Sequence, residues 1–476
     1  MGLNSWILDI PPPARYCSSM SKKELFKSWD WKLVSAVVFF LSTRAALIFV
    51  YDHYWSDTPI YRDAAAALLK GHYIPYRDFW FPYPPLSIPI VAIPFLAAEG
   101  MTGYRTVFQL EMFIFDAITL VYIILFLRRV KASIERQAAA IALYAVFGLA
   151  LGHLVYDRID IAIAAVFASI AYHLSSPDSS PGKRLREWRM ARCANVVGAL
   201  IKIVPLLILP VHVVVEFFND TSKSPGQRIL SAAKPALWIA VPFIVLMFFC
   251  EKATFNDKRD AGMLSIMAEH GARGIQMEST WATPFMLRNA TAVKQGSPPP
   301  YPILTNYGAQ HLDSEWLPRG LLPLAKYAGF ALLATLQLGV GVWLLARPAS
   351  RGAVKDPVWI LEFVTACLLT TLASQRVFSP QYVVWLLPMA ATLPFARRGF
   401  DWKVAFPLCG IVFLTFLEFD RGNYEGLRRF ETASVISVAA RNALCVSAAA
   451  FFALRLFKWK ANLPIDEVEH SKKESI

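Results

Sequence analysis

Charged residues are scarce in this chain of 476 residues. They make up 17% of it, whereas hydrophobic residues make up 56% and soluble globular chains carry about 25% charged residues. Apolar runs, each about as long as a bilayer-spanning helix, recur between Trp31 and Lys458. A large soluble helical core would need helices with polar faces, and runs such as LSAAKPALWIAVPFIVLMFFC have almost none. The sequence therefore predicts an all-α protein that is a polytopic bundle of transmembrane helices.

Several other features are absent. No CxxC pair, Gly-rich nucleotide-binding loop, fixed-period repeat or cleavable signal peptide is visible. The six cysteines occur singly, and five of them lie in or beside apolar runs, so we interpret them as core packing and not as disulfides or metal ligands. They are Cys17, Cys193, Cys250, Cys367, Cys409 and Cys445.

The formal charge of +13 comes from short basic blocks between the apolar runs. This distribution indicates the positive-inside rule and not a nucleic-acid partner. Blocks at 128–137, 182–192, 222–234, 347–355, 396–403 and 458–460 are therefore expected in the cytoplasm. The outer loops are then 52–84, 153–160, 251–320, 374–381 and 418–429.

Two apolar runs need special placement for this topology to close. Run 85–97 contains three prolines, and if it crossed the membrane, block 128–137 would lie outside, so we predict an interfacial or re-entrant helix on the outer face. Run 195–218 must leave the cytoplasm and return to it, with a break near Pro205 and Pro210. The alternative is that both runs are simple spans, which places the two most basic loops outside.

This placement predicts about 12 spans in a single membrane domain, residues 32–458. Residues 1–31 and 459–476 are predicted cytoplasmic tails. The longest outer loop is too short for an ordinary independent fold and should pack on the bundle.

Asp57 lies just past the end of the first predicted span. An ionisable residue at a membrane boundary is costly and suggests function. Thr58 and Pro59 follow, and IYRDAAAALLKG reads as a short amphipathic interfacial helix that carries Tyr61 and Arg62. The helix dipole would keep the Asp57 carboxylate ionised. Two roles stay open for it from these residues alone, a general base and a simple helix cap.

Two further outer segments combine polar and aromatic residues. The aromatic, proline-rich FWFPYPPL contains Tyr83 and is either an interfacial anchor or the wall of a sugar or lipid pocket. The segment YDRID contains Asp157, Arg158 and Asp160, which could bind a divalent cation or form an ion network around the arginine. The spacing does not separate these two alternatives.

The long outer loop and the ends of later spans hold the other candidates. Arg273 could approach a phosphate, and Gln276 and Glu278 could bind sugar hydroxyls, although an amphipathic surface helix is the alternative. Lys202 would either snorkel or pair with a phosphate. Three more polar candidates lie at the outer end of one span: Arg376, Gln381 and Tyr382.

The motifs taken together resemble glycosyltransferase family 87, within the GT-C superfamily of membrane glycosyltransferases. The resemblance rests on D-x-x-x-Y followed by YPPL at 57–86, YDRID, LIKIVPLLILP, RGIQMES and RVFSPQYVVWLLP, in this order over about 330 residues. It implies a GT-C-type bundle with interfacial helices in the first outer loop. It also implies an inverting mannosyltransferase in the cell membrane that uses a polyprenyl-phosphate-linked donor at the extracytoplasmic face, with a glycolipid or glycan as acceptor.

The resemblance also implies roles for single residues. Asp57 would be the general base, and Arg273, Lys202 and Arg376 would stand near the donor phosphate. The sugar and acceptor pocket would be lined by Tyr61, Arg62, Tyr83, Asp157, Arg158, Asp160, Gln276, Glu278, Gln381 and Tyr382. No cofactor is expected, and a divalent metal at Asp157 and Asp160 is the less favoured alternative. Two rival functions remain, a transporter or flippase for a lipid-linked saccharide and a non-catalytic assembly subunit.

Overall fold

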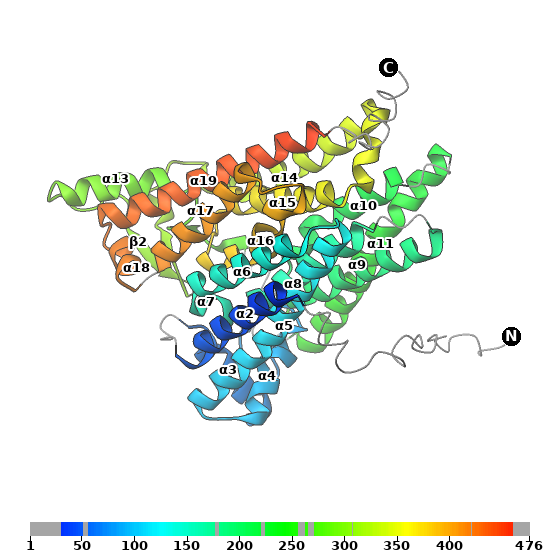
Figure 1. The fold of residues 1–476 in the computed structure, drawn as a ribbon. Coiled ribbons are helices and arrows are strands. Elements are labelled where there is room, and N and C mark those ends of the chain that lie inside the picture. The colour runs from blue at the N-terminus through cyan, green and yellow to red at the C-terminus, as the bar shows by residue number, and fades with distance from the viewer. Residues whose placement is uncertain are drawn as a thin grey trace, which may run out of the picture.

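The computed structural model is a bundle of long helices (Figure 1). It describes residues 30–50, 56–176, 180–219, 224–255, 262–264, 271–306, 308–419 and 421–459. Most of both expected tails, Cys17 and parts of the first and third outer loops lie outside these residues. Eight of the described helices are long and apolar enough to cross a membrane. They are α2 (Trp31–Phe49), α5 (Met101–Arg129), α6 (Ile134–Leu151), α11 (Pro225–Thr254), α14 (Leu321–Ala346), α15 (Pro357–Ser374), α17 (Trp402–Phe419) and α19 (Thr432–Phe457).

The protein is therefore a multi-pass integral membrane protein, and the expected helical class is confirmed. Four further helical segments lie among the long helices. They are α8 (Asp160–Leu174), α9 (Pro181–Ile201), η1 (Val204–Ile208) with α10 (Leu209–Asn219), and η4 (Pro380–Leu386) with α16 (Leu387–Ala396). The expected number of about 12 spans requires these four to cross as well, and it stays a prediction.

Two helices begin earlier than their apolar runs. α9 starts at Pro181 instead of 195, and α11 starts at Pro225 behind a capping box of Ser224 and Gln227. Block 182–192 and most of block 222–234 are thus helical, because Lys and Arg are good helix formers whose stems can lie along apolar surface. The expected break in run 195–218 is present near Pro205, since α9 ends at Ile201 and the chain turns through η1 before α10, whereas Pro210 lies within α10.

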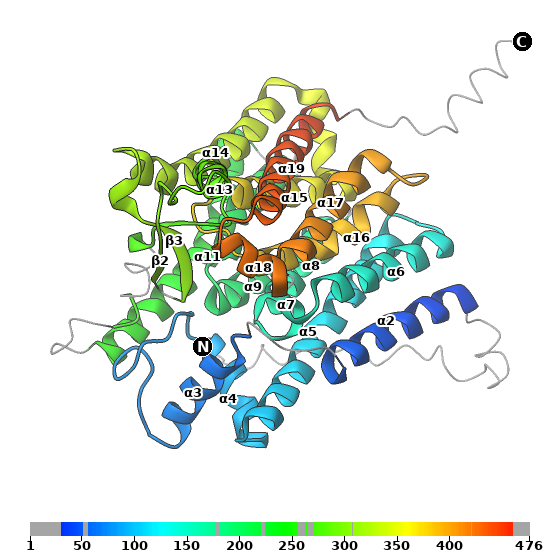
Figure 2. The same ribbon diagram turned by 90° about the vertical axis from the view of Figure 1, so that its left-hand side faces the viewer.

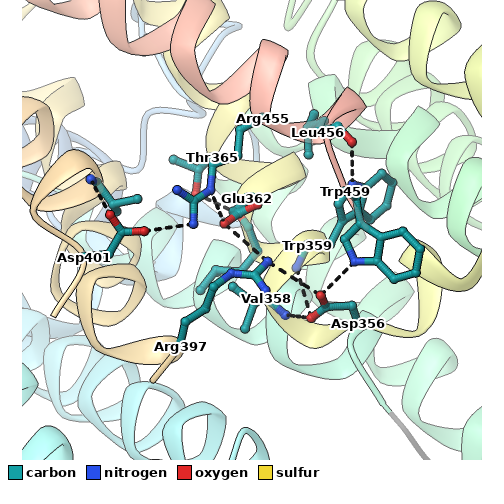
Figure 3. A network of polar contacts seen from close by, with 12 residues as sticks. Asp356, Val358, Trp359, Glu362, Thr365, Arg397, Asp401, Arg455, Leu456 and Trp459 are labelled. Atoms are coloured by element: carbon teal, nitrogen blue, oxygen red, sulfur yellow. Dashed lines mark hydrogen bonds and ion pairs between the residues drawn. The ribbon is translucent and has the colours of Figure 1, made fainter. Parts of the chain in front are cut away.

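One end of the bundle gathers the segments predicted to be cytoplasmic (Figure 3). Asp356 caps α15 and accepts a hydrogen bond from the Trp459 indole at 3.0 Å. Arg455 donates to Glu362 at 2.8 Å, and Arg397 lies 3.6 Å from Asp356. Three of the basic blocks therefore meet at one end of the molecule, and Trp459 packs there as part of the fold.

Block 128–137 lies at the same end, because Arg136 donates to the Phe395 carbonyl at 3.2 Å. At the other boundary, α2 already begins at Trp31, with Asp30 accepting from the Lys32 amide at 2.9 Å. The first helix therefore begins at the last residue of the segment 1–31 that the sequence predicts as a tail.

The opposite end carries α7 (His153–Tyr156), α13 (Thr283–Lys294), α18 (Arg421–Arg428) and a small sheet (Figure 1). Figure 2 shows this end toward the viewer, with α7 and α18 between the sheet on one side and α6 and α2 on the other. The sheet has the antiparallel order β1 (Ile275–Gln276), β3 (Ala309–Leu312), β2 (Ile303–Asn306), with Ile275 and Ile303 both opposite Leu312. An all-α prediction misses this sheet. As expected, the long loop packs on the bundle, since Ile275, Met277 and Leu312 share a core with Leu427 and Val435.

The first outer segment forms two short helices, α3 (Thr58–Leu69) and α4 (Ser87–Ala97). α4 has 11 residues and is about 16 Å long, roughly half of the ~30 Å hydrocarbon thickness. It packs against α3 and α5. Its length favours the predicted interfacial placement over a simple span.

The five described cysteines are all free thiols. Cys367 and Cys445 are buried, Cys250 and Cys409 are half-buried, and Cys193 is exposed. Core packing therefore holds for two of them and is wrong for Cys193, which faces outward from α9.

Candidate active site

Asp57 forms an ion pair with Arg158 at the end of the bundle away from the described basic blocks. The guanidinium Nη1 lies 2.6 Å from the carboxylate Oδ2, and 22% of the Asp57 side chain is exposed. Asp57 stands at the N-cap position of α3 but makes no capping hydrogen bond. Instead the Ser56 hydroxyl accepts from the Thr58 amide at 3.2 Å. The geometry thus leaves Asp57 free of the capping role that was its alternative interpretation.

The second ion pair joins Asp160, the first residue of α8, to Lys202, just after α9. Lys202 Nζ lies 2.7 Å from Asp160 Oδ1, and the same oxygen accepts from the Trp385 indole at 2.7 Å. The ammonium also lies over aromatic rings, 4.8 Å from the Tyr382 centroid and 5.9 Å from that of Tyr83. Lys202 is 16% exposed, and an aromatic surround of this kind stabilises a desolvated cation.

Tyr61 and Tyr83 connect α3 to the aromatic segment that precedes α4. Their hydroxyl groups lie 3.1 Å apart, and their rings pack edge to face. Burial, reinforced by the nearby Asp57 carboxylate, raises the pKa of Tyr83 to about 12. Tyr83 is therefore a neutral hydrogen-bonding group between the two ion pairs.

The electrostatics of Asp57 follow from its surroundings. Burial raises the pKa of Asp57, Arg158 opposes this effect, and Asp160 adds to it. Arg158 supplies a specific counter-charge for this carboxylate. Asp57 also stands at the N-terminus of α3, so the expected effect of the helix dipole stays a prediction. A carboxyl group with a raised pKa and a fixed orientation is suited to accept a proton.

A second polar cluster lies beside the first and includes Glu278. Glu278 is 1% exposed, and its Oε1 accepts from the Tyr424 hydroxyl at 3.0 Å. Its carbonyl accepts from Arg441 and Asn442 of α19. Burial, together with the neighbouring Glu418, raises the pKa of Glu278 to about 8.

Phe419 joins the two clusters. Its ring lies 5.3 Å from that of Tyr424 and 6.0 Å from the Arg158 guanidinium. The segment 376–385 connects them through the chain, because it runs from Arg376 beside Gln276 to Trp385 beside Asp160. The backbone amide of Gln276 donates to the Arg376 carbonyl at 2.9 Å.

Arg273, in segment 251–320, and Arg376, in segment 374–381, lie close together. The Arg376 guanidinium donates to the carbonyls of Arg273 at 2.5 Å and Gly271 at 2.8 Å. Partial burial and, secondarily, the charge of Arg273 lower the pKa of Arg376. The contacts of its guanidinium make Arg376 a brace for residues 271–273.

The structure thus places most of the predicted residues in these clusters. Asp57, Arg158, Asp160, Lys202, Tyr61, Tyr83 and Tyr382 meet in the first. Glu278 lies in the second, and Gln276 lies beside Arg376. Asp157 is buried below the first cluster and accepts from Gln109 of α5 at 2.6 Å. Gln381 bonds to the Ser379 hydroxyl at the start of η4.

Arg62 lies apart from both clusters. Its guanidinium donates to the Glu99 carbonyl at 2.8 Å and to the Asp63 carboxylate at 3.0 Å. It faces the end of α4 because α3 turns the opposite side, that of Tyr61 and Ala65, inward. The helical periodicity of residues 58–69 could have separated Arg62 from Tyr61.

Sequence reasoning missed Gln109, Trp385, Tyr424 and Arg441. Trp385 follows Tyr382 by one turn in RVFSPQYVVWLLP, so its position could have been inferred. Gln109 and Arg441 are polar residues within largely apolar helices, where the free-energy cost of burying a polar group is a signal. Tyr424 carries no local signal, since its partner lies in another loop.

Two residues of YDRID form ion pairs: Asp160 pairs with Lys202, and Arg158 pairs with Asp57. These contacts agree with the ion-network interpretation of the segment. Asp160 Oδ1 is occupied by Lys202 and Trp385. Within the described ranges, no group of three or more His, Cys, Asp or Glu side chains is placed to hold a metal ion.

The long apolar helices make this a multi-pass membrane protein. The two clusters form a polar site at the end of the bundle away from the described basic blocks. No protein-family model and no curated protein matches the chain. Two solved structures of ArnT from Cupriavidus metallidurans are similar to it. The one bound to undecaprenyl phosphate has a TM-score of 0.47 at 14% identity, over 89% of this chain and 76% of that chain. The apo structure has a TM-score of 0.43 at 15% identity, with the same coverage. Likeness at this level does not assign the chain to a family.

Proposed function

We propose that the protein is a membrane glycosyltransferase that uses a polyprenyl-phosphate-linked sugar at the extracytoplasmic face. The observation that carries the proposal is the paired arrangement at the outer end, with Asp57 on Arg158 beside Lys202 on Asp160. It supplies one carboxylate for a proton and one cation for a phosphate. Every basic block whose contacts are described above lies at the other end of the bundle, which favours an extracytoplasmic site.

The reaction we propose is a single displacement. A hydroxyl oxygen of the acceptor attacks the anomeric carbon of the donor, and Asp57 takes the hydroxyl proton. The new carbon–oxygen bond forms as the bond from the anomeric carbon to the phosphate oxygen breaks on the opposite face. The products are the glycosylated acceptor with inverted configuration, a polyprenyl phosphate that keeps the electron pair, and protonated Asp57.

Asp57 suits the role of base for two reasons. Burial raises its pKa and so makes the carboxylate a better proton acceptor, while Arg158 keeps it charged and oriented. The hydroxyl groups of Tyr61 and Tyr83 stay neutral near it and can hydrogen-bond a sugar.

Lys202 suits the role of counter-charge for the departing phosphate. Its ammonium is held by Asp160 and surrounded by aromatic rings, where its charge is screened less than it would be in water. Charge stabilisation in such a site contributes strongly to catalysis. Arg273 and Arg376 are proposed to extend the positive site toward the lipid-linked phosphate.

Mannose as the donor sugar and a glycolipid or glycan as the acceptor are proposals from the motif resemblance. The proposed chemistry uses no cofactor, and Lys202 takes the charge-neutralising role that a metal at Asp157 and Asp160 would have.

The test uses purified protein in liposomes that contain radiolabelled polyprenyl-phosphate-mannose and membrane lipids. We expect label to move from the donor to an acceptor lipid or added glycan, and the Asp57→Asn variant to lose this transfer. Label that crosses the bilayer without a change of carrier would identify a flippase instead. A protein that neither transfers nor moves the label would refute both activities and leave an assembly subunit.

A further inference from the structure

A fully buried polar network lies beneath the first cluster, among α2, α5, α6 and α7. At its centre is Asp116 of α5, which is inaccessible to solvent. Its Oδ2 accepts from Arg44 Nε at 2.7 Å and from the Tyr156 hydroxyl at 2.6 Å. Its Oδ1 accepts a hydrogen bond from the Tyr144 hydroxyl. Each charge in this network therefore has a partner.

Arg44 completes the network with backbone contacts. It donates to the Ala145 carbonyl at 3.0 Å and lies over the Phe40 ring at 4.5 Å. The guanidinium occupies the space beside Gly148, where a Cβ atom would come within 2.3 Å of it. The helices therefore leave room for this arginine at a residue without a side chain.

The network is connected to the reaction site through one tyrosine. Tyr156 directly precedes Asp157 and Arg158, and Arg158 holds Asp57 at 2.6 Å. On α5, Gln109 lies about two turns before Asp116 and thus on the same face. Gln109 donates to Asp157 at 2.6 Å. One face of α5 therefore holds two successive residues of the loop. Asp116 accepts a hydrogen bond from Tyr156, and Gln109 donates one to Asp157, the residue before Arg158.

Stability alone does not account for this arrangement. A buried ion pair replaced by well-packed apolar residues is often neutral or stabilising, so such a pair is weak support for the fold. Apolar residues could not, however, fix the hydroxyl of Tyr156. What the polar network adds to packing is a hydrogen bond that fixes the Tyr156 hydroxyl at the start of segment 156–158.

We infer that Asp116 is a positioning residue that, through Tyr156, keeps the Arg158 guanidinium within ion-pair distance of the Asp57 carboxylate. This inference rests on the proposed function, in which Asp57 is the base. It assigns the network a role in the orientation of the base, with no direct contact to the substrate.

The test compares two variants that each remove one hydrogen bond to the same carboxylate. Tyr156→Phe keeps the ring and loses the bond that connects Asp116 to the loop. Tyr144→Phe is the matched control, because its hydroxyl also bonds to Asp116 but it belongs to α6. Transfer is measured against pH with polyprenyl-phosphate-mannose as donor.

We expect Tyr156→Phe to lower kcat about 10-fold or more, with little change in the KM for the donor. Its acid limb in the pH profile of kcat/KM should move to higher pH, because Arg158 no longer opposes the effect of burial on the pKa of Asp57. Tyr144→Phe should keep the wild-type profile. Equal effects of the two variants on the profile would overturn the inference.

A second readout separates this inference from the proposed function. Asp57→Cys and Arg158→Cys are combined, and the rate at which a short bifunctional thiol reagent joins them is measured. Adding Tyr156→Phe should slow this cross-linking, and adding Tyr144→Phe should not. Wild-type protein without transfer activity would refute the proposed function, whereas unchanged cross-linking in the Tyr156→Phe background would refute the positioning role.

Discussion

Glu278 contributes to a stability that depends on pH, and replacing it with glutamine should reduce this dependence. Its carboxyl group is buried among Tyr424, Glu418 and Arg441, and burial raises its pKa from the usual 4.5 to about 8. Between these two values the folded protein keeps a proton that the unfolded chain releases. The free energy of unfolding therefore falls as pH rises from about 4.5 to about 8, and the stabilisation is fully present only below this window.

The magnitude follows from the separation of the two pKa values. Each pH unit is worth about 1.4 kcal/mol, so the full change is on the order of 5 kcal/mol as an upper value. Glu278→Gln keeps an oxygen for the Tyr424 hydroxyl and has no charge to bury. Thermal unfolding in detergent at about pH 5 and about pH 9 should show a Tm that falls by several degrees in the wild type and much less in the variant.

Glu425→Gln is the control, since Glu425 lies on the adjoining α18 and pairs with Arg428 near the surface. It should retain the wild-type pH dependence. Parallel curves for wild type and Glu278→Gln would refute the reasoning that Glu278 is protonated in the fold at neutral pH.

Two other predictions follow from the packing. Lys202→Met removes the ammonium that faces Asp160, and we expect turnover with the lipid-linked donor to fall about 100-fold or more. The control Lys70→Met removes an exposed partner of Glu99 and should leave turnover unchanged. Equal activity of the two variants would argue against a role for Lys202 at the phosphate. Gly148→Ala places a Cβ atom against the Arg44 guanidinium and should destabilise the protein by roughly 1–3 kcal/mol. The control Gly341→Ala adds a Cβ atom in open space on α14 and should leave the stability unchanged. The Tm of the two variants is compared with that of the wild type.

The apolar runs and basic blocks that recur along the chain made much of the helical architecture predictable from the sequence. Apolar length predicts the eight long helices, and the basic blocks predict which ends lie together, as the contacts of Arg136 and Arg397 with neighbouring blocks show. Pro205 and Pro210 predict a break in run 195–218, and α9 ends at Ile201. The small sheet was missed because β1 has only two residues and lies within a loop.

The site was predictable only in part, because its pairings join distant segments. Asp57, Arg158, Asp160 and Lys202 could each be selected as costly polar residues, yet nothing local shows which carboxylate faces which cation. The pairs within the bundle were missed for the same reason. Arg44 with Asp116, Arg192 with Glu216, and Glu418 with Arg441 each join two helices.

These internal pairs bear on the rival function of transport, for which charges within the spans are typical. The structure has paired charges among the helices as well as in the candidate site. Each member of these pairs is almost fully buried and bonded to its partner. They are therefore explained by helix packing and loop positioning, and the outer face remains the location of the proposed chemistry.

The most direct test of the central claim is the turnover of Asp57→Asn at saturating donor and acceptor. Asp63→Asn is measured beside it as the matched control, since Asp63 is an exposed carboxylate on the same helix α3. We expect the Asp57 variant to fold like the wild type and to lose transfer by a factor of about 100 or more, while the Asp63 variant keeps it. Wild-type turnover in folded Asp57→Asn protein would contradict the account.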